Sequence, residues 1–269
     1  MSSVNPVFLF PEKMKTNAEI AARMYAASIT LGVGQFCTNP GILIAVDNED
    51  LGTFKQALVA DLEKTAPAKM LHEGIAKNFL EKKLQAVTQE GVQLVYEHPP
   101  LPGLDTLLAG PVLTTTTAGA FMLNSTLREE VFGPYSIIVR CADMEEMLTV
   151  AQHLQGQLTA SILATENEIL KHPILVEAIK NLCGRLILNA VPTGVEVVLS
   201  MQHGGPFPAT TDSRFTSVGA DGIKRFARPI AYQDWPDNLL PDELKDANPL
   251  NIWRTVNNEP TRQALPTNE

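Results

Sequence analysis

The 269 residues are enough for one large domain or two small ones, and a composition of 45% hydrophobic and 19% charged residues is typical of a globular protein. The net charge of −9 arises without any basic block, which argues against nucleic acid and against an anionic membrane as partners. Three cysteines without CxxC spacing argue against a disulfide framework and predict a reducing cytoplasm, and no apolar run approaches the roughly 20 residues of a bilayer span.

Strand and helix patterns alternate along the chain. Residues 4–10 predict a buried strand, and Thr16 with Glu19 matches a capping box that predicts a helix ending near Gly32. Further strands are predicted at residues 42–46, 92–96, 111–116, 120–123, 135–141, 159–164 and 185–189. Further helices are predicted at residues 50–64, 68–89, 143–154, 176–182 and 220–226. This alternation predicts an α/β domain with a mainly parallel, open sheet flanked by helices.

The sequence changes character after the last predicted strand. Residues 190–215 are typical of a loop, and residues 229–233 of an extended segment. The final residues, 236–269, are rich in proline and asparagine, which predicts an extended arm or partial disorder.

One thiol lies in a setting that favours exposure. Cys37 belongs to the run Gly34-Gln35-Phe36-Cys37-Thr38-Asn39-Pro40-Gly41, between a predicted helix and a predicted strand. A lone cysteine is most often a small buried hydrophobe. Here the polar neighbours and the bend enforced by glycine and proline favour a thiol at the mouth of a cleft. We expect Cys37 to be a nucleophile, which requires a lowered pKa or a base that takes its proton.

No histidine is adjacent to Cys37 in the sequence, so its activation must come from elsewhere in the fold. His203, directly before Gly204 and Gly205, is a candidate because imidazole titrates near neutrality. A loop histidine is also typical of a plain surface residue. The other two cysteines, Cys141 and Cys183, fall within strand and helix patterns and are predicted to be inert core residues.

Three motifs together resemble the aldehyde dehydrogenase superfamily. The Cys37 run is similar to the nucleophile loop of that family, Glu130-Val131-Phe132-Gly133-Pro134 resembles its Glu-x-Phe-Gly-Pro motif, and residues 184–189 are similar to its late strand ending in asparagine. Residues 204–207 match its Pro-Phe-Gly-Gly segment in altered order. The motifs occur in the family's order over roughly residues 1–233. The Phe36–Gly41 run and residues 226–233 further resemble the branch of fatty-aldehyde and α-ketoglutaric semialdehyde (2,5-dioxovalerate) dehydrogenases.

The resemblance implies the oxidation of an aldehyde with NAD or NADP. Cys37 would attack the carbonyl to give a thiohemiacetal, a hydride would leave to the nicotinamide, and water activated by a glutamate would hydrolyse the thioester. It also implies that Glu130 accepts hydrogen bonds from the nicotinamide ribose and that Phe132 lies against the nicotinamide; a turn-capping glutamate and a core phenylalanine are the alternatives. No metal is expected. Residues expected to line or support the substrate site are Phe36, Asn189 (equally typical of a turn), Val191, Thr193 and Val195.

The resemblance also sets the expected organisation: a catalytic domain over residues 1–228, then an oligomerisation-type strand and an extended tail over residues 229–269. Only 36 residues precede Cys37, so we expect the family's N-terminal nucleotide-binding half and its general-base glutamate to be absent. We then expect the isolated chain to oxidise no aldehyde with NAD(P).

The expected partners are a small-molecule aldehyde, the absent nucleotide-binding domain and further copies of this chain, in the cytoplasm. Two other interpretations stay open. One is a stand-alone cysteine esterase that uses Cys37 and His203. The other is a non-enzymatic subunit that only assembles with others.

Overall fold

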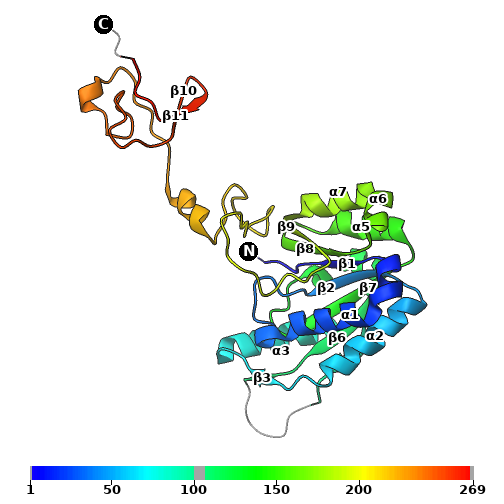
Figure 1. The fold of residues 1–269 in the computed structure, drawn as a ribbon. Helices are drawn as coiled ribbons and strands as arrows, with labels where there is room; N and C mark the ends of the chain where they lie inside the picture. The colour runs from blue at the N-terminus through cyan, green and yellow to red at the C-terminus, as the bar shows by residue number, and fades with distance from the viewer. Residues whose placement is uncertain (1, 100–106, 267–269) are drawn as a thin grey trace. The chain divides into compact units, whose positions relative to one another are not determined.

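The computed structural model describes residues 2–99 and 107–266 (Figure 1). Its contacts divide the chain into two units, Met1–Arg225 and Phe226–Glu269. The larger unit holds the sheet and the long helices, and it is the unit that carries the candidate site.

A seven-stranded sheet forms the centre of the larger unit, with its strands in the order β4-β6-β7-β2-β1-β8-β9. Every neighbouring pair is parallel except β4 and β6 at one edge, which are antiparallel. The strands span Val7–Leu9 (β1), Ile42–Val46 (β2), Gln93–Glu97 (β4), Val112–Thr117 (β6), Tyr135–Cys141 (β7), Gln157–Leu163 (β8) and Cys183–Leu188 (β9). A small antiparallel pair joins Ala68–Lys69 (β3) to Leu108–Ala109 (β5). The predicted α/β fold with a mainly parallel sheet is confirmed.

Helices lie on both faces of the sheet (Figure 1). The α-helices span Pro11–Thr30 (α1), Glu49–Leu62 (α2), Glu73–Val87 (α3), Ala118–Leu123 (α4), Met144–His153 (α5), Glu166–Lys171 (α6) and Pro173–Leu182 (α7). The 3₁₀ helices span Leu31–Gly34 (η1), Ser125–Arg128 (η2), Ala220–Phe226 (η3) and Asp237–Leu239 (η4). No helix in the described ranges combines the length and the apolarity needed to cross a membrane.

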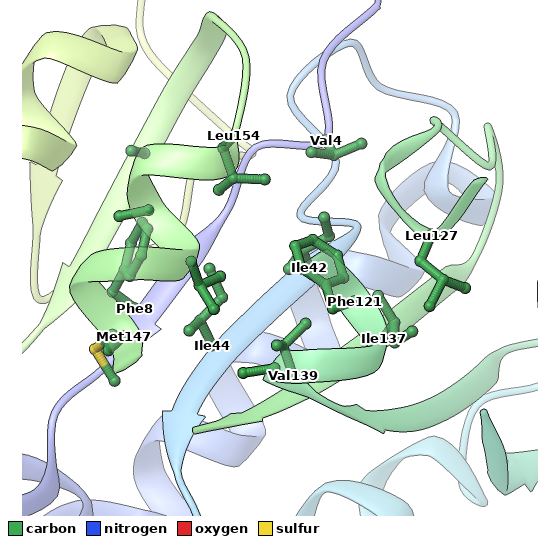
Figure 2. Close-up of a cluster of buried hydrophobic side chains, with 14 of the residues drawn as sticks. Val4, Phe8, Ile42, Ile44, Phe121, Leu127, Ile137, Val139, Met147 and Leu154 are labelled. Carbon is green, nitrogen blue, oxygen red and sulfur yellow. The ribbon is translucent and has the colours of Figure 1, made fainter. Parts of the chain in front are cut away.

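Successive side chains of the central strands point to opposite faces of the sheet, so the unit has two hydrophobic cores, one on each face. In β1, Val7 and Leu9 pack with the buried side chains of α1 and α2, whereas Phe8 points to the opposite face. Figure 2 shows this second core, where Phe8 and the strand residues Ile44 and Val139 lie with side chains from α4 and α5. Both faces of a parallel strand are therefore covered, which is why these strands are apolar throughout.

Four predicted elements are corrected by the structure. The first long helix begins at Pro11 rather than at Thr16; proline suits the first helical position, and Thr16 lies inside the helix beside a kink at Asn17. Residues 120–123 belong to helix α4, because the Thr117 hydroxyl accepts a hydrogen bond from Ala120 N and caps it. The helix predicted at 68–89 begins only at Glu73. The last predicted helix, residues 220–226, is 3₁₀.

The smaller unit contains little regular structure. Residues 229–233 are not paired in a sheet within the described chain, and the oligomerisation-type strand expected there stays a prediction. The predicted extended tail contains a hairpin of β10 (Arg254–Val256) and β11 (Glu259–Thr261). Asn257 and Asn258 join the two strands, and both have positive φ, as a two-residue hairpin turn requires. Residues 267–269 of the predicted tail lie outside the described residues.

Candidate active site

The loop that carries Cys37 is shaped by a left-handed turn at the end of α1. Gly32, Val33 and Gly34 all have positive φ, at 54°, 59° and 65°. A side chain at Gly34 would place its Cβ 2.2 Å from the Gly133 carbonyl oxygen, so only glycine lets the loop pass so close to that backbone. The turn leaves the Cys37 side chain exposed, as predicted from its neighbours.

The structure places His203 beside this thiol. The distance from Cys37 Sγ to His203 Nε2 is 3.3 Å, although 166 residues separate them in the sequence. Two neighbouring residues fix the His203 backbone: its N–H donates to Thr216 Oγ1 at 2.9 Å, and its carbonyl accepts from the Ser217 hydroxyl at 2.9 Å. Partial burial, together with the positive charge of Arg185, lowers the pKa of His203 below its ordinary value. The ring is therefore neutral at pH 7 and can accept a proton from the thiol.

Glycines allow the His203 segment to lie directly on the sheet. A Cβ at Gly184, near the start of β9, would lie 1.9 Å from the Gly204 carbonyl oxygen. A Cβ at Gly205 would lie 2.1 Å from the Gln157 carbonyl oxygen at the start of β8. These two close approaches fix the path of residues 203–205 over the ends of two neighbouring strands. That path determines where the His203 imidazole lies relative to the Cys37 loop.

The side chain of a buried asparagine, Asn5, holds the Cys37 loop by hydrogen bonds to its backbone. Its Nδ2 donates to the carbonyl oxygens of Cys37 at 2.9 Å and of Asn39 at 3.0 Å. Its Oδ1 accepts from the hydroxyls of Ser3 at 2.8 Å and of Thr159 at 3.0 Å. Sequence reasoning did not single out Asn5. The available signal was a polar residue inside an otherwise apolar run, because a buried polar side chain must be hydrogen-bonded.

The segment with Glu130 and Phe132 contacts the same loop. Asn39 Nδ2 donates to the Gly133 carbonyl oxygen at 3.1 Å, which joins the two segments. Glu130 and Phe132 are both half-buried. Glu130 also lines a cleft of about 420 Å³, together with Ser2, Val4, Lys82, Ser125, Arg128, Glu129, Leu154, Gln155, Gln157 and Pro208. Burial raises the pKa of the Glu130 carboxyl to about 7, and a hydrogen bond to the Ser3 backbone opposes the rise.

Replacing this carboxyl by an amide, Glu130→Gln, is expected to make the stability of the chain less dependent on pH. The folded-state pKa of about 7 lies above the ordinary 4.5, so the folded chain binds the proton more tightly and loses stability as pH rises from 4.5 through 7. The variant should therefore be more stable than the wild type above pH 7, by up to about 3 kcal/mol. Urea unfolding at pH 5 and pH 8 measures the difference.

The neighbouring glutamate provides the control for this experiment. Glu129 is exposed and pairs with Lys82 at 2.6 Å, so Glu129→Gln should change stability by less than about 1 kcal/mol at either pH. Equal responses of the two variants to pH would contradict the assignment of the shift to Glu130.

The remaining predicted site residues lie on the loop after β9 and beside the thiol. Asn189 has a φ of 53°, and its side chain pairs with both backbone groups of Ala164, so it forms a turn that ties the end of β9 to β8. Thr193 Oγ1 lies 2.6 Å from Ser28 Oγ of α1 and holds the loop there. Val191 is half-buried, whereas Val195 and Phe36 are exposed at 45% and 38%. Thus the loop is anchored at Asn189 and Thr193, with Val191 between the two anchors and Val195 beyond the second.

The other two thiols are placed differently from Cys37. Cys141 is buried and Cys183 is half-buried. Burial raises the pKa of Cys141 to about 12 and that of Cys183 to about 11, so both remain protonated at neutral pH. Within the described ranges, no group of three or more His, Cys, Asp or Glu side chains could hold a metal ion.

Two curated relatives of this chain are both alpha-ketoglutaric semialdehyde dehydrogenases. The chain is 42% identical over 254 residues to alpha-ketoglutaric semialdehyde dehydrogenase 2 of Azospirillum brasilense, covering 94% of this chain and 48% of that protein. It is 39% identical over 257 residues to an alpha-ketoglutaric semialdehyde dehydrogenase of Acinetobacter baylyi, covering 96% of this chain and 49% of that protein. The chain thus spans about half the length of the curated relatives it matches.

Solved structures share the fold at low identity. A betaine aldehyde dehydrogenase from Staphylococcus aureus in complex with NAD⁺ superposes with a TM-score of 0.65 at 16% identity, over 84% of this chain and 44% of that one. A succinic semialdehyde dehydrogenase from Streptococcus pyogenes, in complex with NADP⁺, gives a TM-score of 0.61 at 18% identity, over 76% of this chain and 44% of that one. The model of the aldehyde dehydrogenase family matches residues 1–207. Together with the curated relatives, that match establishes that this chain belongs to the aldehyde dehydrogenase family.

Proposed function

We propose that this chain supplies the nucleophile and the substrate-binding wall of an enzyme that oxidises an aldehyde to a carboxylic acid. The observation that carries the proposal is the 3.3 Å distance from the exposed Cys37 sulfur to the imidazole of His203. A thiol next to a neutral imidazole can lose its proton and attack an electrophilic carbon. Family membership makes an aldehyde the electrophile expected at that position.

The first step uses only residues of this chain. His203 Nε2 takes the thiol proton while Cys37 Sγ forms a bond to the aldehyde carbon, and protonation of the carbonyl oxygen completes a thiohemiacetal. The backbone N–H of Cys37 has no acceptor among the described residues, so it is free to donate to the developing oxyanion. Asn5 orients this loop by holding the Cys37 carbonyl. Hydrolysis of the later thioester returns the thiol.

The nicotinamide part of NAD or NADP would be held by the segment that contacts the Cys37 loop through Asn39 and Gly133. The half-buried Glu130 carboxylate lies on the wall of the cleft, where it can accept hydrogen bonds from ribose hydroxyls. The Phe132 ring, also half-buried, offers an apolar face on the segment joined to the Cys37 loop. If bound there, the nicotinamide would supply the hydride acceptor that aldehyde oxidation requires.

The aldehyde proposed as substrate is α-ketoglutaric semialdehyde or a close analogue. Both curated relatives carry that name, at 42% and 39% identity over nearly the whole of this chain. The half-buried and exposed valines after β9 suit the short carbon chain of such an aldehyde.

Ester hydrolysis is a second candidate function, favoured by the same pair. A thiol and an imidazole at 3.3 Å suffice for acyl transfer to sulfur and for activation of water without any nucleotide. The two candidates differ in one requirement, because only aldehyde oxidation consumes NAD(P).

Complementation tests the proposed function. The 269-residue chain alone is expected to form no NAD(P)H from α-ketoglutaric semialdehyde, because it spans about half the length of its curated relatives. Joining it to the part of the Azospirillum brasilense relative that this chain does not match, by mixing or in a single-chain fusion, should restore NAD(P)H formation. Cys37→Ser in the same fusion should not. A fusion that hydrolyses an activated ester through Cys37 but never reduces NAD(P) would overturn the oxidation proposal in favour of the hydrolase.

A further inference from the structure

A half-buried cation lies near the thiol without a carboxylate partner in the described part of the chain. Arg185, on β9, donates from Nη2 to the Pro192 carbonyl oxygen at 2.6 Å, and its buried Nε has no hydrogen-bond partner there. Burial lowers the pKa of Arg185, which reflects the cost of removing its charge from water. A guanidinium offers five N–H donors, so Arg185 has unused capacity to bind an anion.

The strand register directs Arg185 toward the nucleophile loop. Arg185 is the partner of Thr159 in β8, and paired residues of adjacent strands present their side chains on the same face. Thr159 Oγ1 donates to Asn5, which in turn donates to the carbonyl of Cys37. The register therefore places Arg185 on the same face of the sheet as Thr159 and Asn5, the residues that hold the Cys37 loop. The charge of Arg185 also lowers the pKa of the His203 ring.

We propose that Arg185 is the receptor for a carboxylate carried by the aldehyde substrate, and that it selects acid-bearing aldehydes over neutral ones. The inference rests on the proposed function and names the residue that would set its specificity. A guanidinium binds a carboxylate through two parallel hydrogen bonds, here from its two Nη groups, which unlike Nε are not buried without a partner. Such a contact would pair the charge of Arg185 and hold the far end of the substrate while Cys37 reaches the aldehyde carbon.

Arg185 has an alternative role that an experiment must distinguish from carboxylate binding. The same charge could act only on the thiolate of Cys37, without contacting any substrate. That role would change the reactivity of the thiol toward every electrophile equally, whereas a carboxylate receptor would favour anionic electrophiles alone.

Two alkylating probes separate the two roles of Arg185. Both are applied to the 269-residue chain without any added domain. Iodoacetamide and iodoacetate both transfer a carbon to a thiolate with loss of iodide, but only iodoacetate is an anion. The rate at Cys37 is followed by mass spectrometry of the peptide that contains it, which excludes signal from the two less reactive thiols. The ratio of the iodoacetate rate to the iodoacetamide rate is compared among the wild type, Arg185→Gln, Arg185→Lys and Arg23→Gln. Arg23 is an exposed residue of α1 and serves as the control for net charge.

Arg185→Gln is expected to lower that ratio by about tenfold, the size of a charge interaction near 1.4 kcal/mol. Arg185→Lys should keep only part of the ratio, because an ammonium keeps the charge but cannot form the two parallel hydrogen bonds, and Arg23→Gln should leave it unchanged. Thermal unfolding midpoints of all four proteins confirm that the fold is kept. The proposal is overturned if both rates fall together in Arg185→Gln, if the ratio does not change, or if Arg23→Gln lowers it equally. None of these outcomes depends on NAD(P) reduction, so failure here is distinguishable from failure of the proposed function.

Discussion

Cys37→Ser is expected to abolish aldehyde oxidation in the complemented enzyme, with a loss of at least about a thousandfold in kcat/KM. A hydroxyl is far less acidic and a weaker nucleophile than a thiol, so the imidazole of His203 activates serine much less than it activates cysteine. The side chain is exposed, so the substitution should change the free energy of unfolding by less than about 0.5 kcal/mol. NAD(P)H formation and urea unfolding are the two measurements.

A second variant of the Cys37–His203 pair is expected to give a smaller, partial loss of thiol reactivity. His203→Gln keeps the nucleophile and removes the base, so the alkylation of Cys37 by iodoacetamide at pH 7 should slow by about a hundredfold. The wild-type rate should fall as pH drops and the imidazole becomes protonated. Burial and the charge of Arg185 lower the pKa of His203, so this fall should lie below pH 6.5. An unchanged rate in His203→Gln would show that the imidazole is not the base.

The parallel core of the fold could be predicted from the sequence because its signals are local. The strand predicted at residues 135–141 coincides with β7, and the helix predicted at 143–154 differs from α5 by one residue at each end. The start of α5 was predictable because the Asp143 side chain accepts a hydrogen bond from Glu146 N and caps the helix there. In contrast, residues 120–123 are too few for their periodicity to separate a strand from a helix.

The candidate site could be predicted only in part, because its contacts join distant segments. Cys37 was found from its neighbours, and His203 was found as a candidate, but nothing in the sequence states that they lie 3.3 Å apart. Asn5 and Arg185 were missed altogether. Each acts through partners that are remote in the sequence, such as Thr159, and these contacts follow from the order of β1, β8 and β9 in the sheet. That order is a property of the whole fold.

Gly184→Ala is expected to destabilise the chain by on the order of 3 kcal/mol and to slow the alkylation of Cys37. The new Cβ would lie 1.9 Å from the Gly204 carbonyl oxygen, which is backbone and cannot rotate away. The neighbouring Gly205 is also close to backbone, because a Cβ there would lie 2.1 Å from the Gln157 carbonyl oxygen. The segment must move outward as a whole, and it takes His203 away from the thiol.

The matched control is Gly52→Ala, the same substitution at a site with open space. Gly52 lies in α2, and a Cβ there meets no heavy atom within 4 Å. Alanine is the better helix former, so this variant should gain about 0.5–1 kcal/mol and leave the reactivity of Cys37 unchanged. Urea unfolding and iodoacetamide rates on both variants measure the contrast. Equal stabilities for the two variants, or a wild-type alkylation rate in Gly184→Ala, would contradict the role of the close backbone approach in positioning the imidazole.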